Sequence, residues 1–254
     1  MLVVYYGQVI FMDEILRPNT ILTHSAHKGH KLKGEQGRNP YDGLRPWSAI
    51  THGAGILLGV IGTILLLIRA AQVGGALRLA VFAVYGLSMI GLYTASTLYH
   101  CIRNSPEGRM NLRRLDHASI YLLIAGSYTP ICLLSLRGPW GWTLFGVIWA
   151  LAIAGIFLSV VWIMAPRWLT AGLYLFMGWI AVFAIYPLSK VLPGHGMALL
   201  VAGGLLYTIG GVLYALKWPG RDNPRFGCHE IFHLFILAGS VVHFLLMYQI
   251  VAFA

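Results

Sequence analysis

The sequence predicts an all-α membrane protein built as a seven-transmembrane helix bundle. Hydrophobic residues make up 58% of the chain and charged residues only 10%, whereas a soluble domain is usually about one quarter charged. After Trp47, apolar stretches of about 18 residues or more follow one another, and each is long enough to cross a bilayer as a helix. Barrel strands would instead alternate polar and apolar residues over about ten positions.

Two regions are expected. Residues 1–46 are polar, hold the turn signals Asn39-Pro40 and Asp42-Gly43, and are predicted to form a disordered cytoplasmic tail. Residues 47–254 are predicted to form one membrane domain. Its spans are expected at 47–71, 76–100, 115–136, 140–164, 168–190, 198–217 and 229–252.

The positions of the lysines and arginines predict the orientation of the bundle, because cytoplasmic loops carry an excess of positive charge. Of the 18 such residues, all but Arg69, Arg78, Arg137 and Lys190 fall in the tail or in the second, fourth and sixth loops. This asymmetry predicts a cytoplasmic N-terminus and an outside C-terminus. The net charge of +10 is then explained by orientation and by contact with anionic lipid head groups, not by nucleic-acid binding.

Polar residues cluster at three of the predicted helix ends, although ionisable groups inside a membrane are costly and usually functional. Ser96 and His100 close the second span, Asp116 opens the third, and His229 and His233 open the seventh. The orientation inferred from charge alone places all three ends on the cytoplasmic side. A shared site is therefore expected there.

The spacing of the histidines predicts a zinc site. His229 and His233 are four residues apart, so their side chains are offset by only about 40° around a helix and both can reach one ion. With His100 they supply three imidazoles and leave an open position, as in catalytic zinc centres. Zinc lowers the pKa of bound water toward about 7, and Asp116 would orient or deprotonate that water. Ser96 would hold the His100 imidazole or the bound water in place without binding the metal itself.

Glu230 offers an alternative base, because His229-Glu230-Ile231-Phe232-His233 also matches the HExxH pattern of soluble zinc proteases. Further histidines are left outside the metal set. His52, on the first span, is expected beside the site as a supporting group. His117 is expected to face backbone or head groups. His243 lies about 20 Å deeper by helical rise and is expected to anchor helices or to form the floor of a cavity.

The motifs together resemble the hemolysin III family, which is similar to the progestin and adipoQ receptors, including the adiponectin receptors. The resemblance covers nearly all seven spans. It rests on the stretches 48–53 (SAITHG), 96–100 (STLYH), 115–130 (LDHASIYLLIAGSYTP) and 229–244 (HEIFHLFILAGSVVHF). It implies that His100, His229 and His233 bind zinc, with Asp116 at the bound water and Ser96 in support. It also implies a cell-membrane location, in the bacterial inner membrane.

Three functions remain open. The first is a zinc-dependent lipid hydrolase that acts on an acyl amide or ester, an activity implied by the alkaline ceramidases of the wider superfamily. The second is a non-enzymatic, lipid-responsive homeostasis protein or receptor with structural zinc. The third is a pore-forming hemolysin, which the uniformly apolar spans support least because they offer no polar face to line a pore. All three have membrane lipids as partners.

Overall fold

The computed structural model describes residues 2–5, 8–11, 44–220, 223 and 226–254. Leu2–Tyr5 (β1) and Gln8–Phe11 (β2) pair as antiparallel strands, which the sequence analysis did not predict. Most of residues 1–46, for which disorder was predicted, lie outside the described residues. The strands belong to a compact unit that ends at Arg38, and the helices belong to a second unit, Asn39–Ala254.

The second unit is helical throughout. Its elements are α1 (Pro46–Val73), α2 (Ala76–Cys101), α3 (Pro106–Pro130), the π-helix η2 (Ile131–Leu136), α4 (Gly138–Val161), α5 (Arg167–Trp179), the 3₁₀-helix η3 (Ile180–Ala184), α6 (Ile185–Val191), α7 (Gly194–Leu216), α8 (Cys228–Gln249) and the 3₁₀-helix η4 (Val251–Phe253). Among the described residues, seven stretches are long and apolar enough to span a membrane, and α5, η3 and α6 together form the fifth. The predicted seven-helix bundle is confirmed.

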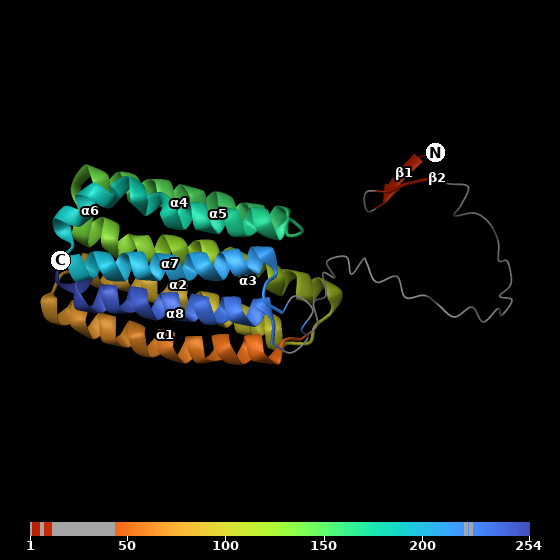
Figure 1. Ribbon diagram of the computed structural model, residues 1–254, viewed down its shortest axis with the longest axis horizontal. Coiled ribbons are helices and arrows are strands. Elements are labelled where there is room, and N and C mark those ends of the chain that lie inside the picture. The colour runs from red at the N-terminus through yellow and green to blue at the C-terminus, as the bar shows by residue number, and fades with distance from the viewer. Residues whose placement is uncertain (1, 6–7, 12–43, 221–222, 224–225) are drawn as a thin grey trace, which may run out of the picture. The chain divides into compact units, whose positions relative to one another are not determined.

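The long helices lie side by side along one direction (Figure 1). Neighbours in sequence pack together from α1 to α4, α7 packs on α8, and α1 also packs on α8 and closes the bundle. The third span is the most enclosed, with 67% of its apolar window buried against 17–44% for the others. The third span is therefore the one most shielded from the surface of the bundle.

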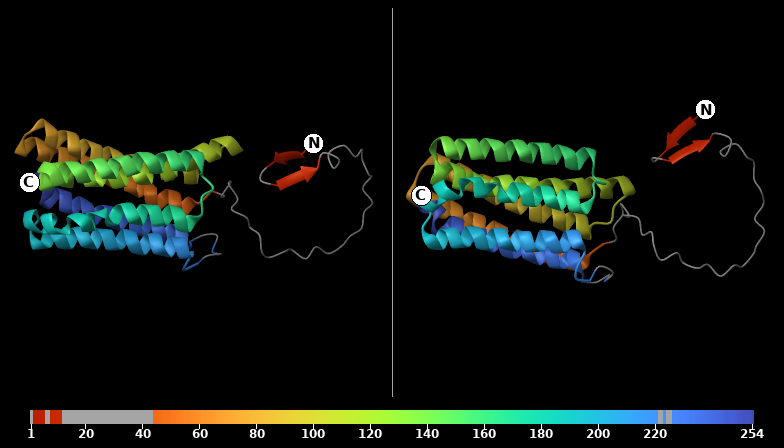
Figure 2. Two further views of the ribbon diagram at one scale, coloured as in Figure 1. Left: turned by 90° about the horizontal axis from the view of Figure 1, so that it is seen from above. Right: turned by 45° about the horizontal axis from the view of Figure 1, so that its top comes forward.

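The start of α3 differs from the prediction, because the helix begins at Pro106 and not at residue 115. The Ser105 hydroxyl caps this end by accepting a hydrogen bond from the Gly108 backbone N–H at 3.2 Å, and Pro106 occupies the first turn. These early turns are polar, so a search for apolar stretches missed them. They extend past the ends of the neighbouring helices (Figure 2).

The fifth span is interrupted near its middle, and Tyr128 of α3 binds the polar backbone groups at the interruption. Its hydroxyl donates to the carbonyl oxygen of Gly178 at 2.6 Å and accepts from the N–H of Ala181 at 2.9 Å. Backbone groups inside a membrane need such partners. The break between α5 and η3 is thus held against α3.

Candidate metal centre

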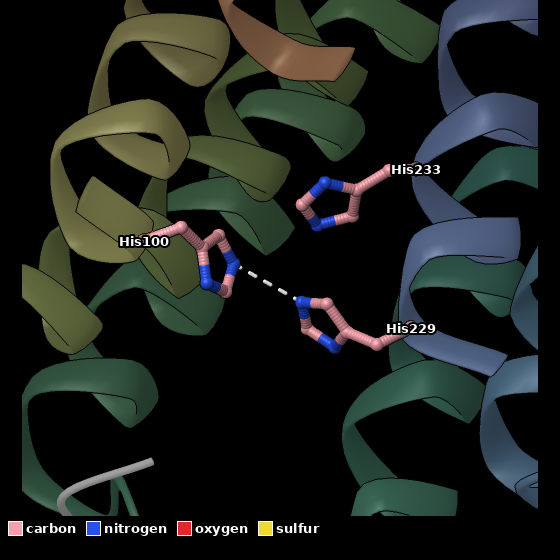
Figure 3. A group of neighbouring side chains, drawn as sticks. All are labelled: His100, His229 and His233. Carbon is pink, nitrogen blue, oxygen red and sulfur yellow. Dashed lines mark hydrogen bonds between the residues drawn. The ribbon is translucent and has the colours of Figure 1, made fainter. Parts of the chain in front are cut away.

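Three histidines from two helices meet at the end of the bundle where α2 ends and α8 begins. His100 projects from α2, and His229 and His233 project from α8 toward it (Figure 3). The Nε2 atoms of His100 and His229 are 3.0 Å apart. One nitrogen from each of the three rings lies within 4.8 Å of the others. Nitrogen ligands about 2 Å from a tetrahedral ion are separated by about 3.4 Å, so small side-chain movements bring the set to one ion.

The surroundings of the cluster also fit a metal. His100 and His233 are only 1% and 2% exposed. Nδ1 of His233 faces the backbone carbonyl of Ser48 at 3.3 Å, which leaves its Nε2 for the cluster. This arrangement is common in metal sites, where a second hydrogen bond orients the imidazole. Nδ1 of His100 is buried without a hydrogen-bond partner among the described residues.

Asp116 and Ser96 lie beside this cluster, along one cavity. Ser96 is 2% exposed, and its side chain interacts with the carboxylate of Asp116, which is half-buried on α3. Both residues line the cavity together with His229 and His233. Asp116 therefore lies near the end of α2 and the start of α8, but it sits inside α3 and not at its first turn. It is not part of the three-residue group that can hold an ion.

The cavity has a volume of about 180 Å³ and runs from the histidines into the bundle. Its walls are mainly apolar, and most of their residues come from α3, α5, η3, α7 and α8. Val182 and Val201, which are 48% and 41% exposed, line it too, so it reaches the lipid-facing surface between η3 and α7. At its deep end, Nε2 of His243 lies 3.3 Å from the Leu200 carbonyl oxygen, as expected of a cavity floor or helix anchor.

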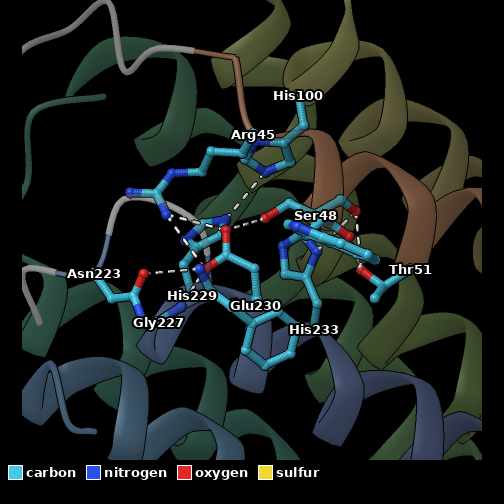
Figure 4. Close-up of polar contacts among 11 residues, drawn as sticks. Arg45, Ser48, Thr51, His100, Asn223, Gly227, His229, Glu230 and His233 are labelled. Carbon is cyan, nitrogen blue, oxygen red and sulfur yellow. Dashed lines mark hydrogen bonds and ion pairs between the residues drawn. The ribbon is translucent and has the colours of Figure 1, made fainter. Parts of the chain in front are cut away.

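Three hydrogen-bond donors engage the Glu230 carboxylate, so it is not placed to act as a general base. Its Oε1 accepts hydrogen bonds from the Ser48 hydroxyl at 2.8 Å and from Arg45 Nη1 at 3.1 Å, and its Oε2 accepts from the Gly227 N–H at 2.9 Å (Figure 4). The side chain is 1% exposed. The carboxylate thus joins the start of α1 to the start of α8. The protease-like alternative loses support.

Sequence reasoning missed Arg45, because nothing in its local sequence indicates a partner 185 residues away. The role of Glu230 did have a local signal: it lies at the third position of α8, where an acidic side chain commonly reaches back to the capping residue. His117 also lines the cavity, which the sequence analysis did not expect. His52 stacks on His233, which confirms its expected place beside the site.

Comparisons with known proteins agree with this architecture. Residues 46–244 match the family described as Haemolysin-III related. The chain is 45% identical over 199 residues to Hemolysin-3 of Bacillus cereus, covering 78% of this chain and 87% of that protein. It is 40% identical over 197 residues to the Hemolysin-3 homolog of Bacillus subtilis (strain 168), covering 78% and 89%.

A more distant relative belongs to the progestin and adipoQ receptor family. It is the human Monocyte to macrophage differentiation factor, 26% identical over 168 residues, or 63% of this chain and 66% of that protein. With the seven apolar helices, these matches confirm the resemblance drawn from the motifs. The chain belongs to the haemolysin-III-related family and is a multi-pass membrane protein.

Proposed function

We propose that this protein binds zinc through His100, His229 and His233 and hydrolyses an acyl lipid, either an amide or an ester. The observation that carries the proposal is the convergence of three imidazoles on one point beside a mainly apolar cavity that Asp116 also lines. Three histidines with no fourth protein ligand are typical of catalytic zinc, whereas structural zinc is usually bound by four side chains.

The residues of the site have separate roles in the proposed hydrolysis. When bound, zinc supplies a Lewis acid that polarises a carbonyl group and makes water easier to deprotonate. Asp116 accepts a proton from water at a carboxylate oxygen and returns it to the leaving group. The Ser96 side chain, which interacts with that carboxylate, keeps it oriented toward the cavity. The apolar walls bind the acyl chain and exclude bulk water from the reacting groups.

Metal analysis and turnover test the proposal together. We expect the detergent-purified parent to hold about one equivalent of zinc, and His229→Ala and His233→Ala to lose most of it, because each removes one of three ligands. Asp116→Asn should keep the zinc but lose activity on a panel of ceramide-like amides and phospholipid esters by about 100-fold or more. Less than half an equivalent of zinc in the parent would contradict the metal assignment.

One observation favours a second candidate, a structural metal in a lipid-responsive protein. The histidine cluster joins α2 to α8, and both of these helices also pack against α1. An ion there would clamp the two helices together. In that case His100→Ala should lower the thermal stability sharply, whereas Asp116→Asn should preserve cellular function and the parent should show no turnover on the lipid panel.

A further inference from the structure

His52 of α1 is a buried histidine that no hydrogen bond accounts for. Its side chain is 3% exposed, and neither Nδ1 nor Nε2 has a hydrogen-bond partner among the described residues. Buried polar atoms are nearly always paired, so an unpaired one calls for an explanation. His52 lines the same cavity as Asp116 and the histidines of α8. A hydrogen-bond partner for His52 is therefore expected inside that cavity.

The ring of His52 is held in place by its neighbours and cannot easily turn toward another partner. One face stacks on His233, with ring centroids 3.6 Å apart and an interplanar angle of 10°. Tyr93 packs edge-on against it at 5.1 Å and 79°. Tyr93 is itself anchored by a 2.8 Å hydrogen bond to Ser240, and Gly55 leaves the space that its ring occupies.

Two pairs of polar groups near this end of the cavity already interact with each other. Asp116 interacts with Ser96, and His100 faces His229. A neutral imidazole carries one N–H donor and one acceptor. The His52 ring lies near the backbone of His233, but its N–H reaches no acceptor at hydrogen-bond distance among the described residues. Because its ring is stacked on that of His233, a proposed zinc ligand, His52 lies in the same part of the cavity as the proposed metal position.

We propose that His52 donates a hydrogen bond to the carbonyl oxygen of the acyl lipid bound in the cavity. A carbonyl oxygen is the acceptor that acyl amides and esters share, and it must lie close to the histidines for the proposed hydrolysis. The inference rests on the proposed function for the identity of the ligand, but it does not require turnover. It assigns His52 a contact with the ligand and no bond to the metal.

Binding of two tritiated probes to the full-length, zinc-loaded protein in phosphatidylcholine nanodiscs, measured on ice before appreciable turnover, tests this assignment. Palmitamide carries a carbonyl group, and heptadecane is a chain of nearly equal size without one. His52→Phe keeps an aromatic ring to stack on His233 but removes both nitrogens, and His52→Gln restores a donor. His195→Phe, at an exposed position of α7, is the matched control.

We expect His52→Phe to weaken palmitamide binding about tenfold, the usual effect of losing one hydrogen bond in a buried site. Heptadecane binding and zinc content should stay at the parent values, His52→Gln should bind palmitamide within about threefold of the parent, and His195→Phe should behave as the parent does. Equal palmitamide binding by His52→Phe and the parent would overturn the inference. So would a parent without preference for palmitamide, or loss of zinc from His52→Phe.

A spectroscopic measurement on the parent tests the same contact, with His52→Gln used only to assign the signal. In protein labelled with ¹⁵N-histidine, palmitamide should shift the ring N–H signal that is missing from His52→Gln, and an unchanged signal would overturn the inference. Failure of the proposed hydrolysis gives a different result. In that case the parent shows no turnover while its palmitamide binding still depends on His52.

Discussion

Two carboxylates lie near the histidines, and their contacts assign them different roles. Glu230 accepts hydrogen bonds from Arg45, Ser48 and the Gly227 backbone, so it is fully engaged. Asp116 interacts with Ser96 and faces the cavity. The sequence places both residues beside the site, and the family resemblance favours Asp116 as the base. Their contacts in the structure separate a structural carboxylate from one that can face a substrate.

Glu230→Ala should therefore lower stability and leave the metal in place. The change leaves the buried Ser48 hydroxyl and the buried Gly227 N–H without their hydrogen-bond acceptor. It also leaves the partly exposed Arg45 without its ion pair. We expect a loss of about 1–3 kcal/mol, measured as a lower midpoint of thermal unfolding in detergent. Asp116→Asn is the matched control and should unfold close to the parent. A stable, zinc-loaded but inactive Glu230→Ala protein would instead favour Glu230 as the base.

At the scale of elements, the approach of α1 to α2 positions His52 and Tyr93. Gly55 faces the Tyr93 ring so closely that a Cβ atom there would lie 2.5–2.8 Å from three ring atoms. Gly53, half a turn away on the same helix, has no atom within 4 Å of its would-be Cβ. The two glycines look alike in the sequence, but only one is required by packing.

This difference predicts opposite effects for the same substitution. Gly55→Ala should destabilise the protein by about 1–3 kcal/mol, because Tyr93 must move or the helices must separate. Gly53→Ala should be neutral or stabilising by up to about 1 kcal/mol, since alanine favours helix and meets no neighbour. Thermal unfolding of both variants beside the parent measures this. Equal midpoints for the two variants would contradict the packing described for α1 and α2.

At the scale of the whole molecule, the charge asymmetry still predicts a cytoplasmic N-terminus and an outside C-terminus. The three cysteines offer a direct test, because Cys101 is exposed whereas Cys132 and Cys228 are buried. Cys101 ends α2, at the same end of the bundle as the histidine cluster. Its accessibility therefore reports the side of the membrane on which the candidate site lies.

We expect a membrane-impermeant maleimide to leave Cys101 unlabelled in intact cells that express the protein and to label it after permeabilisation. Cys101→Ser should abolish the labelling in both conditions, which confirms that the signal comes from this thiol. Labelling of Cys101 in intact cells would reverse the orientation. The candidate site would then face the outside, away from cytosolic substrates.

The sequence by itself determined the seven spans, because a helix must be continuously apolar to cross the bilayer and this property is local. It also determined the pair His229 and His233, since a spacing of four residues places two side chains on one helix face. The start of α3 escaped prediction because its first turns are polar. A capping serine and a proline, not hydrophobicity, define that boundary.

Only the tertiary structure decided which distant groups meet. The partnership of Arg45 with Glu230 and the stacking of His52 on His233 each join α1, or the chain just before it, to α8 at the far end of the sequence. Such contacts depend on the path of all the helices between them. The unpaired nitrogens of His52 became visible only when every neighbouring side chain was in place, because the lack of a partner is a property of the packed bundle.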